Sequence, residues 1–363
     1  MRRDAVPTPS LVLDLDALER NVATMVARAK EAGVGLRCHA KSHKSVDVAR
    51  LLRRAGALGP ACATIQEAET MAAGGLDGIL ITSPMVTPDA LEKVEKLLLR
   101  GADLLLVVDD PANLDALGAL ADAIGRTLKL IVELDVGVGR TGCRDIAGAV
   151  DLAERIDGDP RFEFAGIQAY WGHLQQVVPI EDRVRRVQEQ VERTRELIEA
   201  LKKAGRPPRI VTGSGTGTSW IDSASGIFTE LQPGSFLFLD SCYGTVPITP
   251  DGKNPFEPSL FVAAGVVSAN HPGRAVTNAG WKALAADSGK PVPKRGAPQG
   301  ATYRFMGDEH GAVEHEAGSL PGPGAVIELL TSHCDPTVNL HRQYHVVRGD
   351  QVVDIWPIGA RGY

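Results

Sequence analysis

The sequence has few of the features that mark membrane, nucleic-acid-binding or disulfide-stabilised proteins. No apolar run in its 363 residues approaches the ~20 residues that a membrane-spanning helix needs. Lys and Arg together number 39 against 45 Asp and Glu, which is not the balance of a nucleic-acid binder. The five cysteines are odd in number and widely spaced, so they predict a reducing cytoplasm and no disulfide framework. Residues 1–10 hold two arginines with no apolar stretch behind them, so we expect no secretory signal.

The first two-thirds of the chain alternates short apolar runs with helical patterns. The segment 14–33, with Asp16 as its expected N-cap, and the segment 181–205 have apolar residues at helical spacing. Runs rich in Val, Ile, Leu and Phe are typical of strands buried on both faces of a parallel sheet. Eight such units predict a (β/α)₈ barrel over residues 15–244, with a doubly wound open sheet as the competing fold. The expected strands are residues 35–40, 60–65, 78–83, 103–110, 128–135, 164–170, 209–213 and 235–240.

The pattern changes after residue 244. A Pro- and Gly-rich connection at 245–258 leads into strand-like runs separated by turn residues. Gly349-Asp350 between alternating apolar runs indicates a hairpin. We therefore expect a second, β domain formed by residues 245–363, and the strand-like opening at 1–14 is assigned to it.

Polar residues gather where the expected barrel strands end, which is where barrel enzymes carry their active sites. They are Lys41, His43, Thr82, Ser83, Asp109, Asp135, Arg140, Tyr170, His173, Asp240 and Tyr243. After the seventh strand, "VTGSGTGTS" (211–219) interleaves glycines with hydroxyl residues. Glycines let backbone amides approach a ligand closely, so Ser214, Gly215, Thr216 and Gly217 form a candidate phosphate cradle, although a flexible turn has the same composition.

A lysine at one strand end and a phosphate cradle at another indicate pyridoxal 5'-phosphate. This cofactor needs an amine for a Schiff base and an anchor for its phosphate. A lone lysine would be read as a surface charge, but beside the cradle Lys41 becomes the candidate amine.

A second constellation, "SHCDPTVNLH" (332–341), lies in the expected β domain. His333 and Asp335 are two residues apart, so on an extended strand both would face one side and Cys334 the other. An imidazole and a carboxylate suit a divalent cation with open water positions, whereas an ordinary edge strand is the alternative. Asp308 and His310 in "GDEHG" are further candidates near this pair.

The motifs "TPSLVLDLDALERN", "RCHAKSHKS", "ELDVGVGRTG", "TGSGTGTS", "DEHG" and "SHCDPTVNLH…ARGY" follow one another along the whole chain. Together they resemble the D-threonine aldolase and D-serine dehydratase group, which are fold-type III pyridoxal phosphate enzymes with an alanine-racemase-like barrel. The resemblance implies that Lys41 forms the Schiff base. It also implies that Arg140 faces the phenolic oxygen, that Tyr170 lies by the pyridine ring, and that Gly215, Thr216 and Gly217 hold the phosphate. A homodimer is implied as well.

The metal motif separates the branches of this group. In this group the aldolases carry a His-x-Asp motif, whereas the D-serine dehydratases carry a His-x-Cys motif that binds zinc. The resemblance of His333 and Asp335 to the first motif implies the aldolase form. An oxygen ligand favours Mn²⁺ or Mg²⁺, with Zn²⁺ as the alternative. Two features depart from the aldolase pattern: Gln176 stands where aldolases usually carry a histidine, and residues 62–69 and 81–86 resemble the dehydratases.

The expected reaction is cleavage of a D-β-hydroxy-α-amino acid, such as D-threonine, to glycine and an aldehyde. His173 or a hydroxide bound to the metal is the candidate base, and Lys41, Arg140, Tyr170, Ser214 to Gly217 and Tyr243 are the candidate cofactor site. The alternatives are a 3-hydroxy-D-aspartate aldolase, a dehydratase of D-serine or 3-hydroxy-D-aspartate, a racemase and a non-catalytic pyridoxal phosphate carrier. Neither nucleic acid nor a membrane is an expected partner.

Overall fold

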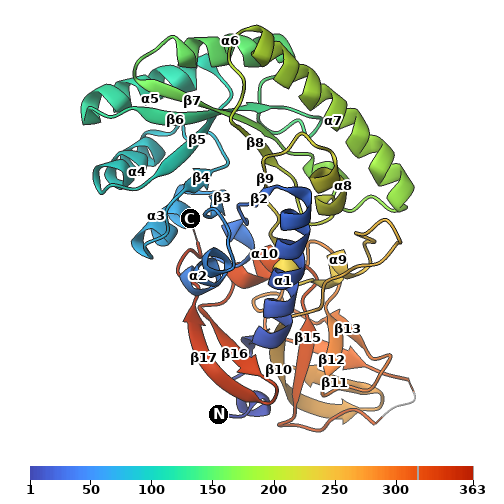
Figure 1. The fold of residues 1–363 in the computed structure, drawn as a ribbon. Coiled ribbons are helices and arrows are strands. Elements are labelled where there is room, and N and C mark those ends of the chain that lie inside the picture. Colours follow the sequence, from blue (N-terminus) through green and yellow to red (C-terminus); the bar gives the residue numbers. More distant parts are fainter. Residues whose placement is uncertain (317–318, 363) are drawn as a thin grey trace.

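The computed structural model describes residues 1–316 and 319–362, which form a barrel and a β domain stacked end to end (Figure 1). The barrel strands are β2 (Gly35–Leu36), β3 (Ala61–Cys62), β4 (Ile79–Ile81), β5 (Leu104–Val108), β6 (Leu128–Leu134), β7 (Phe162–Ala169), β8 (Ile210–Gly213) and β9 (Glu230–Leu231). The helices among and after them are α1 (Leu15–Ala32), α2 (Val46–Arg54), α3 (Ile65–Ala73), α4 (Pro88–Leu99), α5 (Pro111–Ile124), α6 (Ile146–Asp157), α7 (Ile180–Lys203), α8 (Ser219–Ala224) and α9 (Ser241–Gly244).

The eight strands form one parallel sheet in the order β2-β9-β8-β7-β6-β5-β4-β3. A parallel bridge between His39 and Ala61 joins the two ends of this order. The Ala61 N–H also donates to the Cys38 carbonyl at 3.1 Å. The sheet therefore closes on itself, as the predicted barrel requires, and the open doubly wound sheet is excluded.

The eighth strand is not where the sequence placed it. The apolar run 235–240 forms the 3₁₀ turn η4 (Ser235–Leu237), and the strand is β9, five residues earlier. Phe236, Leu237 and Phe238 are buried, and Phe236 packs against Phe256 with ring centroids 5.5 Å apart. A short run that is apolar throughout has no period, so a buried turn and a buried strand look alike in sequence.

The barrel interior holds a small apolar layer and a buried ion pair between Arg37 and Glu230. Leu80, Leu105, Val107 and Ile131 lie in the layer. Where β7 passes β8 there is no room for a side chain, since a Cβ on Gly166 would lie 1.9 Å from the Ile210 carbonyl oxygen.

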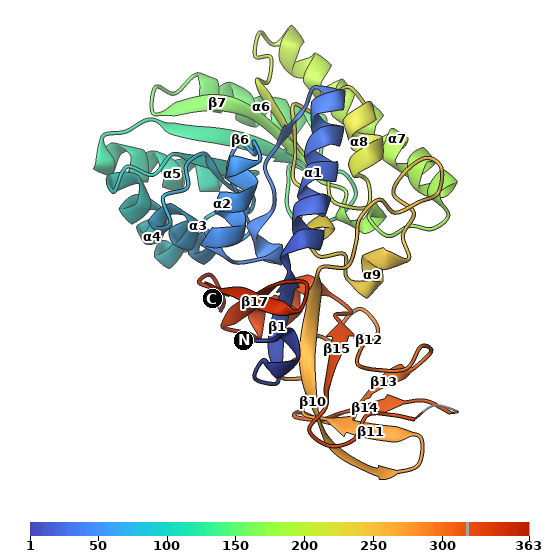
Figure 2. The ribbon, with the colours of Figure 1, turned by 60° about the horizontal axis from the view of Figure 1, so that its bottom comes forward.

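The β domain is built from β1 (Ser10–Asp14) and strands from the last third of the chain (Figure 2). β1 pairs antiparallel with β10 (Leu260–His271) and parallel with β16 (Gln343–Arg348). The predicted hairpin is confirmed, because β16 turns at Gly349-Asp350 into β17 (Gln351–Pro357). The remaining elements are β11 (Arg274–Thr277), β12 (Val292–Arg295), β13 (Thr302–Phe305), β14 (Gly311–Glu314), β15 (Val326–Leu330) and a short helix, α10 (Cys334–Asn339).

Two local predictions are wrong. The first helix is capped by Asp14, whose Oδ1 accepts the Ala17 N–H at 3.1 Å, instead of by Asp16. The segment with the expected metal pair is not an extended strand, since Asp335 lies in α10 and His333 is its N-cap residue. Pro336 is tolerated in the first turn of a helix, where its missing N–H has no intrahelical partner to lose.

Within the described residues, no helix combines the length and apolarity needed to cross a membrane.

Arg37 and Glu230 supply the first test, because their buried ion pair joins β9 to the segment that continues β2. Arg37 Nε donates to Glu230 Oε1 at 2.7 Å and Nη2 to Oε2 at 2.8 Å. Arg37→Met leaves a buried carboxylate without its partner, and we expect a loss of about 3–5 kcal/mol in the free energy of unfolding by urea. The double variant Arg37→Met/Glu230→Gln should recover most of that loss, and equal losses in both proteins would contradict this.

Candidate active site

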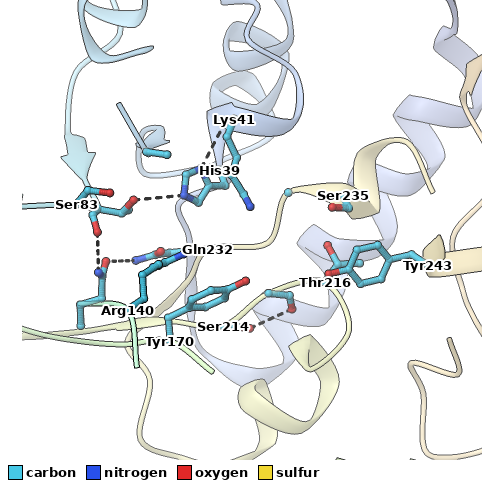
Figure 3. A pocket seen from close by; sticks show the side chains of 15 residues that line it. His39, Lys41, Ser83, Arg140, Tyr170, Ser214, Thr216, Gln232, Ser235 and Tyr243 are labelled. Atoms are coloured by element: carbon cyan, nitrogen blue, oxygen red, sulfur yellow. Dashed lines mark hydrogen bonds between the residues drawn. The ribbon is translucent and has the colours of Figure 1, made fainter. Parts of the chain in front are cut away.

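A cavity opens at the carboxyl ends of the barrel strands (Figure 3). The hydroxyl side chains of Ser235 and Thr216 lie at one end and Arg140 at the other. Seven of the predicted cofactor residues line the cavity: Lys41, Arg140, Tyr170, Ser214, Gly215, Thr216 and Tyr243.

Lys41 lies in the 3₁₀ turn η2 (Ala40–Ser42), directly after the β2 segment. Its Nζ is 3.1 Å from Asp335 Oδ2, which belongs to the β domain. The Asp335 carboxylate is the main cause that raises the pKa of Lys41, against the effect of burial. Burial also acts to raise the pKa of Asp335, but the charges of Lys41 and His333 outweigh it and the pKa is lowered. The two side chains therefore form a charged pair across the domain boundary.

The other basic groups of "GLRCHAKSHKS" are not a solvated cluster. Burial lowers the pKa of His39 and of His43 to about 3, so both imidazoles are neutral near pH 7. His39 lines the cavity, and Lys44 forms a buried ion pair with Glu67. Each of these three basic side chains is thus held by the fold.

Arg140 and Tyr170 form a pair at the end of the cavity away from the hydroxyl groups. The Arg140 guanidinium carbon lies 5.7 Å from the centre of the Tyr170 ring, which is the geometry of a cation–π contact. The two residues follow neighbouring strands, β6 and β7, so the contact places a charge and an aromatic face side by side.

The glycine-rich loop after β8 is shaped by a neighbouring side chain, Gln175. Gln175 Oε1 accepts the N–H groups of Gly217 at 3.0 Å and Thr218 at 3.3 Å. A Cβ on Gly215 would lie 2.4 Å from Gln175 Oε1, and one on Gly217 would lie 1.8 Å from the Gln175 carbonyl oxygen. Two of the glycines are therefore needed for packing on Gln175.

Behind the loop, a buried chain of hydrogen bonds continues from Gln175. Gln175 Nε2 donates to Thr218 Oγ1 at 2.9 Å, and the Thr218 hydroxyl donates to Asp222 Oδ2. Asp222 Oδ1 accepts the indole N–H of Trp171 at 3.1 Å. Gln175 and Asp222 were not predicted from the sequence. A local signal was present for Asp222, which lies in α8 four residues after Thr218, the residue that precedes this helix.

The predicted metal pair lies beside Lys41, and a third side chain reaches it. His333 Nδ1 is 2.6 Å from Asp287 Oδ2, although the two residues are 46 positions apart in sequence. Asp240 anchors the segment, since its Oδ1 accepts the Tyr243 N–H at 3.0 Å and its Oδ2 accepts the Cys334 N–H at 2.8 Å. Among the described residues, no group of three or more metal-ligating side chains is clustered for a metal ion.

Other predicted residues lie outside the cavity lining. His173 is exposed and packs near Gly137, where a Cβ would lie 3.4 Å from its ring. Gln176 is exposed as well. Asp308 and His310 lie on the exposed turn between β13 and β14, and in the described part of the chain neither bonds to His333 or Asp335.

The residues present fit pyridoxal phosphate. A lysine amine, an arginine beside an aromatic ring and a loop of amides and hydroxyls converge on one cavity. Within the described residues, the Gly215 and Thr216 N–H groups have no acceptor, so they are free to bind a phosphate.

The fold and the site define a pyridoxal phosphate enzyme of the alanine racemase type. Residues 13–242 match the model "Alanine racemase, N-terminal domain", and residues 259–347 match "Putative serine dehydratase domain". The chain belongs to this alanine racemase-like family.

Within that family, the chain groups with aldolases. It is 40% identical to a D-threonine aldolase of an Arthrobacter species, over 99% of this chain and 93% of that protein. It is 38% identical to the 3-hydroxy-D-aspartate aldolase of Paracoccus denitrificans, over 100% and 94%. A crystal structure of D-threonine aldolase from Filomicrobium marinum superposes with a TM-score of 0.94 at 39% identity, covering 98% of this chain and 96% of that chain. D-threo-3-hydroxyaspartate dehydratase from a Delftia strain is more distant, at 28% identity over 96% of each.

Gly217→Ala tests the packing of the loop on Gln175. The added Cβ would overlap the Gln175 carbonyl, so the loop must move and the Gly215 and Thr216 amides with it. Overpacking of about 1–3 kcal/mol corresponds to a rise of roughly fivefold to 150-fold in the Kd of pyridoxal phosphate, measured by titrating the apoprotein. Gly322→Ala, where a Cβ meets nothing within 4 Å, is the control. Equal Kd values for the two variants would refute the packing role.

Asp222 predicts a dependence of stability on pH. Burial raises the pKa of its carboxyl to about 7, whereas an unfolded aspartate titrates near ~3.9. Between these two values the folded apoprotein keeps a proton that the unfolded chain releases, so the free energy of unfolding falls as pH rises from about 4 to about 7.

Asp222→Asn should therefore narrow the difference in urea stability between pH 5 and pH 8. The exposed Asp103→Asn should leave that difference as it is in the natural sequence. A pH dependence that survives in Asp222→Asn would assign it to other groups.

Proposed function

We propose that this chain is an aldolase that uses pyridoxal phosphate and a divalent metal to cleave D-β-hydroxy-α-amino acids into glycine and an aldehyde. The observation that carries the proposal is the 3.1 Å contact between Lys41 Nζ and Asp335 Oδ2. It puts the amine that would hold the cofactor and the carboxylate that would hold the metal at one point, at the mouth of one cavity. The identity of 38–40% to two aldolases over the full chain supports the same activity.

The cofactor would be held at both ends of the cavity. Lys41 would attach it covalently, and the amides of Gly215 and Thr216, with the Ser214 hydroxyl, would bind its phosphate. Arg140 would lie at its phenolic oxygen and Tyr170 against its ring. Tyr243, which is buried and lines the phosphate end, would complete the pocket, and Gly217 would keep the loop on Gln175.

Pyridoxal phosphate, when bound, supplies an electron sink for negative charge at the substrate α-carbon. The chain supplies the remaining groups. His333 and Asp335 would hold Mn²⁺ or Mg²⁺, since a hard oxygen ligand favours these over Zn²⁺, which is the alternative. Asp287 would fix the His333 ring through Nδ1 and leave Nε2 for the metal, as carboxylates beside metal-bound histidines do.

A base must accept the proton of the β-hydroxyl group. His173 is the proposed base, because burial and the charge of Arg186 lower its pKa and keep the imidazole neutral. His173 is exposed near Gly137 and does not line the cavity, so in this role it would meet the substrate hydroxyl outside the lining residues. Replacement of His173 by Gln would then abolish the proton transfer but leave binding of the cofactor intact.

The proposal includes a homodimer in the cytoplasm. All five cysteines are free thiols, which suits a reducing compartment. The substrate is a small amino acid, and whether its β-substituent is the methyl of D-threonine or the carboxylate of 3-hydroxy-D-aspartate is decided by assay.

The test is a product assay with pyridoxal phosphate and Mn²⁺. D-threonine, D-phenylserine, D-serine and 3-hydroxy-D-aspartate are offered, and glycine plus aldehyde is scored against keto acid plus ammonia. We expect glycine and an aldehyde. Asp335→Ala should lower kcat/KM roughly 100-fold or more, because it removes a metal ligand, whereas the exposed Asp308→Ala should not. Keto acid and ammonia, or full activity of Asp335→Ala without added metal, would contradict the proposal.

A further inference from the structure

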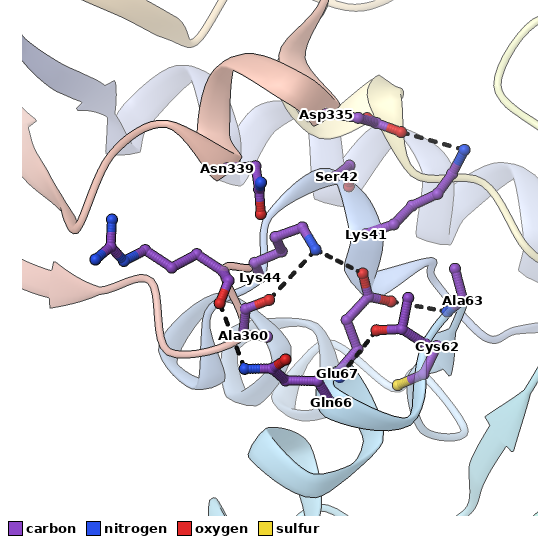
Figure 4. A network of polar contacts seen from close by, with 12 residues as sticks. Lys41, Ser42, Lys44, Cys62, Ala63, Gln66, Glu67, Asp335, Asn339 and Ala360 are labelled. Atoms are coloured by element: carbon purple, nitrogen blue, oxygen red, sulfur yellow. Dashed lines mark hydrogen bonds and ion pairs between the residues drawn. The ribbon is translucent and has the colours of Figure 1, made fainter. Parts of the chain in front are cut away.

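Lys44 is a buried lysine that the proposed chemistry does not use (Figure 4). Its Nζ donates to Glu67 Oε1 at 2.9 Å and to the Ala360 carbonyl at 3.3 Å. Its backbone has φ of +51°, a left-handed conformation that residues with a Cβ rarely adopt. A buried charge on a disfavoured backbone is an arrangement that only its surroundings can maintain.

Lys44 closes the turn that carries Lys41. Its N–H donates to the Ala40 carbonyl at 2.7 Å, so the backbone between Ala40 and Lys44 forms one hydrogen-bonded loop. The loop is held from the β domain as well, since the Tyr344 hydroxyl donates to the His43 carbonyl at 2.6 Å. The position of Lys44 therefore sets where the backbone of Lys41 lies.

The C-terminal segment Ile358–Gly362 connects this turn to the helix that carries Asp335. The Ala360 N–H donates to the Lys44 carbonyl at 3.1 Å, so Ala360 is bound by both the backbone and the side chain of Lys44. Two residues later, the Gly362 N–H donates to Asn339 Oδ1 at 3.0 Å. Asn339 is the last residue of α10, and Asp335 is the second.

Glu67 extends the contact to the cavity wall. Its second oxygen, Oε2, accepts the Ala63 N–H at 2.7 Å, and Ala63 lines the cavity. The neighbouring Gln66 Nε2 donates to the Arg361 carbonyl at 3.4 Å. The start of α3 is thereby tied to the same C-terminal segment that holds Lys44.

A role of the Lys44–Glu67 ion pair in positioning Lys41 and Asp335 explains these features better than a role in stability alone. Two charges taken out of water cost more than an apolar pair of the same volume in many proteins, so a buried ion pair is weak evidence for stability. Here the pair joins three segments that surround Lys41 and Asp335, whose contact crosses the domain boundary. A shift of about 1 Å in such a geometry is enough to lower a catalytic rate by roughly 100-fold.

We propose that Lys44, Glu67, Ala360 and Asn339 form a clamp that sets the distance between Lys41 and Asp335. Lys44 is its central positioning residue. The catalytic consequence rests on the proposed function, because it is the cofactor amine and the metal carboxylate whose separation the clamp fixes. The C-terminal segment is then part of the active site without touching the substrate.

Lys44→Met tests the clamp, because it keeps the length of the side chain and removes its charge. Asn339→Ala alters a partly exposed residue of the same clamp, and it is the second test variant if Lys44→Met does not fold. Lys129→Met removes an exposed ion pair with Asp103 elsewhere in the barrel and is the matched control. Lys44→Arg keeps the charge and should rescue part of the loss.

Four quantities are measured in the holoenzyme: kcat and KM with D-threonine, the Kd of Mn²⁺ by electron paramagnetic resonance, and the relaxation that bound Mn²⁺ causes in the cofactor ³¹P signal. That relaxation falls steeply with distance, so it reports the separation of the two sites. We expect Lys44→Met to lower kcat roughly tenfold to a hundredfold, with a smaller change in KM, and to change the ³¹P relaxation. Asn339→Ala should show the same changes at smaller size, and Lys129→Met none.

Two results would overturn the clamp. One is a Lys44→Met or Asn339→Ala enzyme with the kcat, Mn²⁺ Kd and ³¹P relaxation of the natural sequence. The other result concerns a protein without the proposed activity. If the natural sequence binds no Mn²⁺ and cleaves no substrate, the proposed function is refuted, and the clamp is then tested by the rate at which borohydride fixes pyridoxal phosphate to Lys41. Equal rates in the natural sequence and in Lys44→Met would overturn the clamp independently of the proposed function.

Discussion

The contact between the Lys41 ammonium and the Asp335 carboxylate connects the two domains at the point where the chemistry is proposed. One charge comes from the first turn after a barrel strand and the other from a short helix in the β domain. The Lys41 side chain is 44% exposed and that of Asp335 is 15% exposed, so the pair forms only if both segments bring their charges to the same place. Much of the surrounding structure serves that requirement.

Several buried polar groups hold the two segments from different sides. Asp240 ends the barrel and binds the backbone of Cys334 beside Asp335, and Tyr344 reaches from β16 to the turn after Lys41. The Lys44 ion pair brings the C-terminal segment to the same place. On the opposite side of the cavity, Gln175 shapes the loop that would bind phosphate. Residues far apart in sequence therefore position the segments around one cavity, so the loops there do not have to be ordered by contacts within themselves.

Sequence reasoning was most successful where a pattern repeats or where function requires particular residue types. The barrel follows from the alternation of apolar runs and helices. Lys41, Arg140, Tyr170 and the glycine loop were predicted from their place at strand ends, and they line one cavity, while their roles stay predictions. It failed for the run 235–240, which is apolar without a period, and for the segment at Asp335, where a proline in the first turn conceals a helix. Asp287 and Lys44 were missed because His333 lies 46 residues from the first and Ala360 lies 316 residues from the second, and no local pattern records such a contact.

The central claim is that one amine and one metal-binding carboxylate act on the same substrate. Its most direct test is a crystal structure of the protein with pyridoxal phosphate and Mn²⁺, in which the anomalous signal of manganese locates the ion. The account predicts continuous density from Lys41 to the cofactor, with the phosphate at Gly215 and Thr216, and a manganese peak on His333 and Asp335 at the mouth of the same cavity. A peak at another place, or a cofactor that is not joined to Lys41, would contradict it.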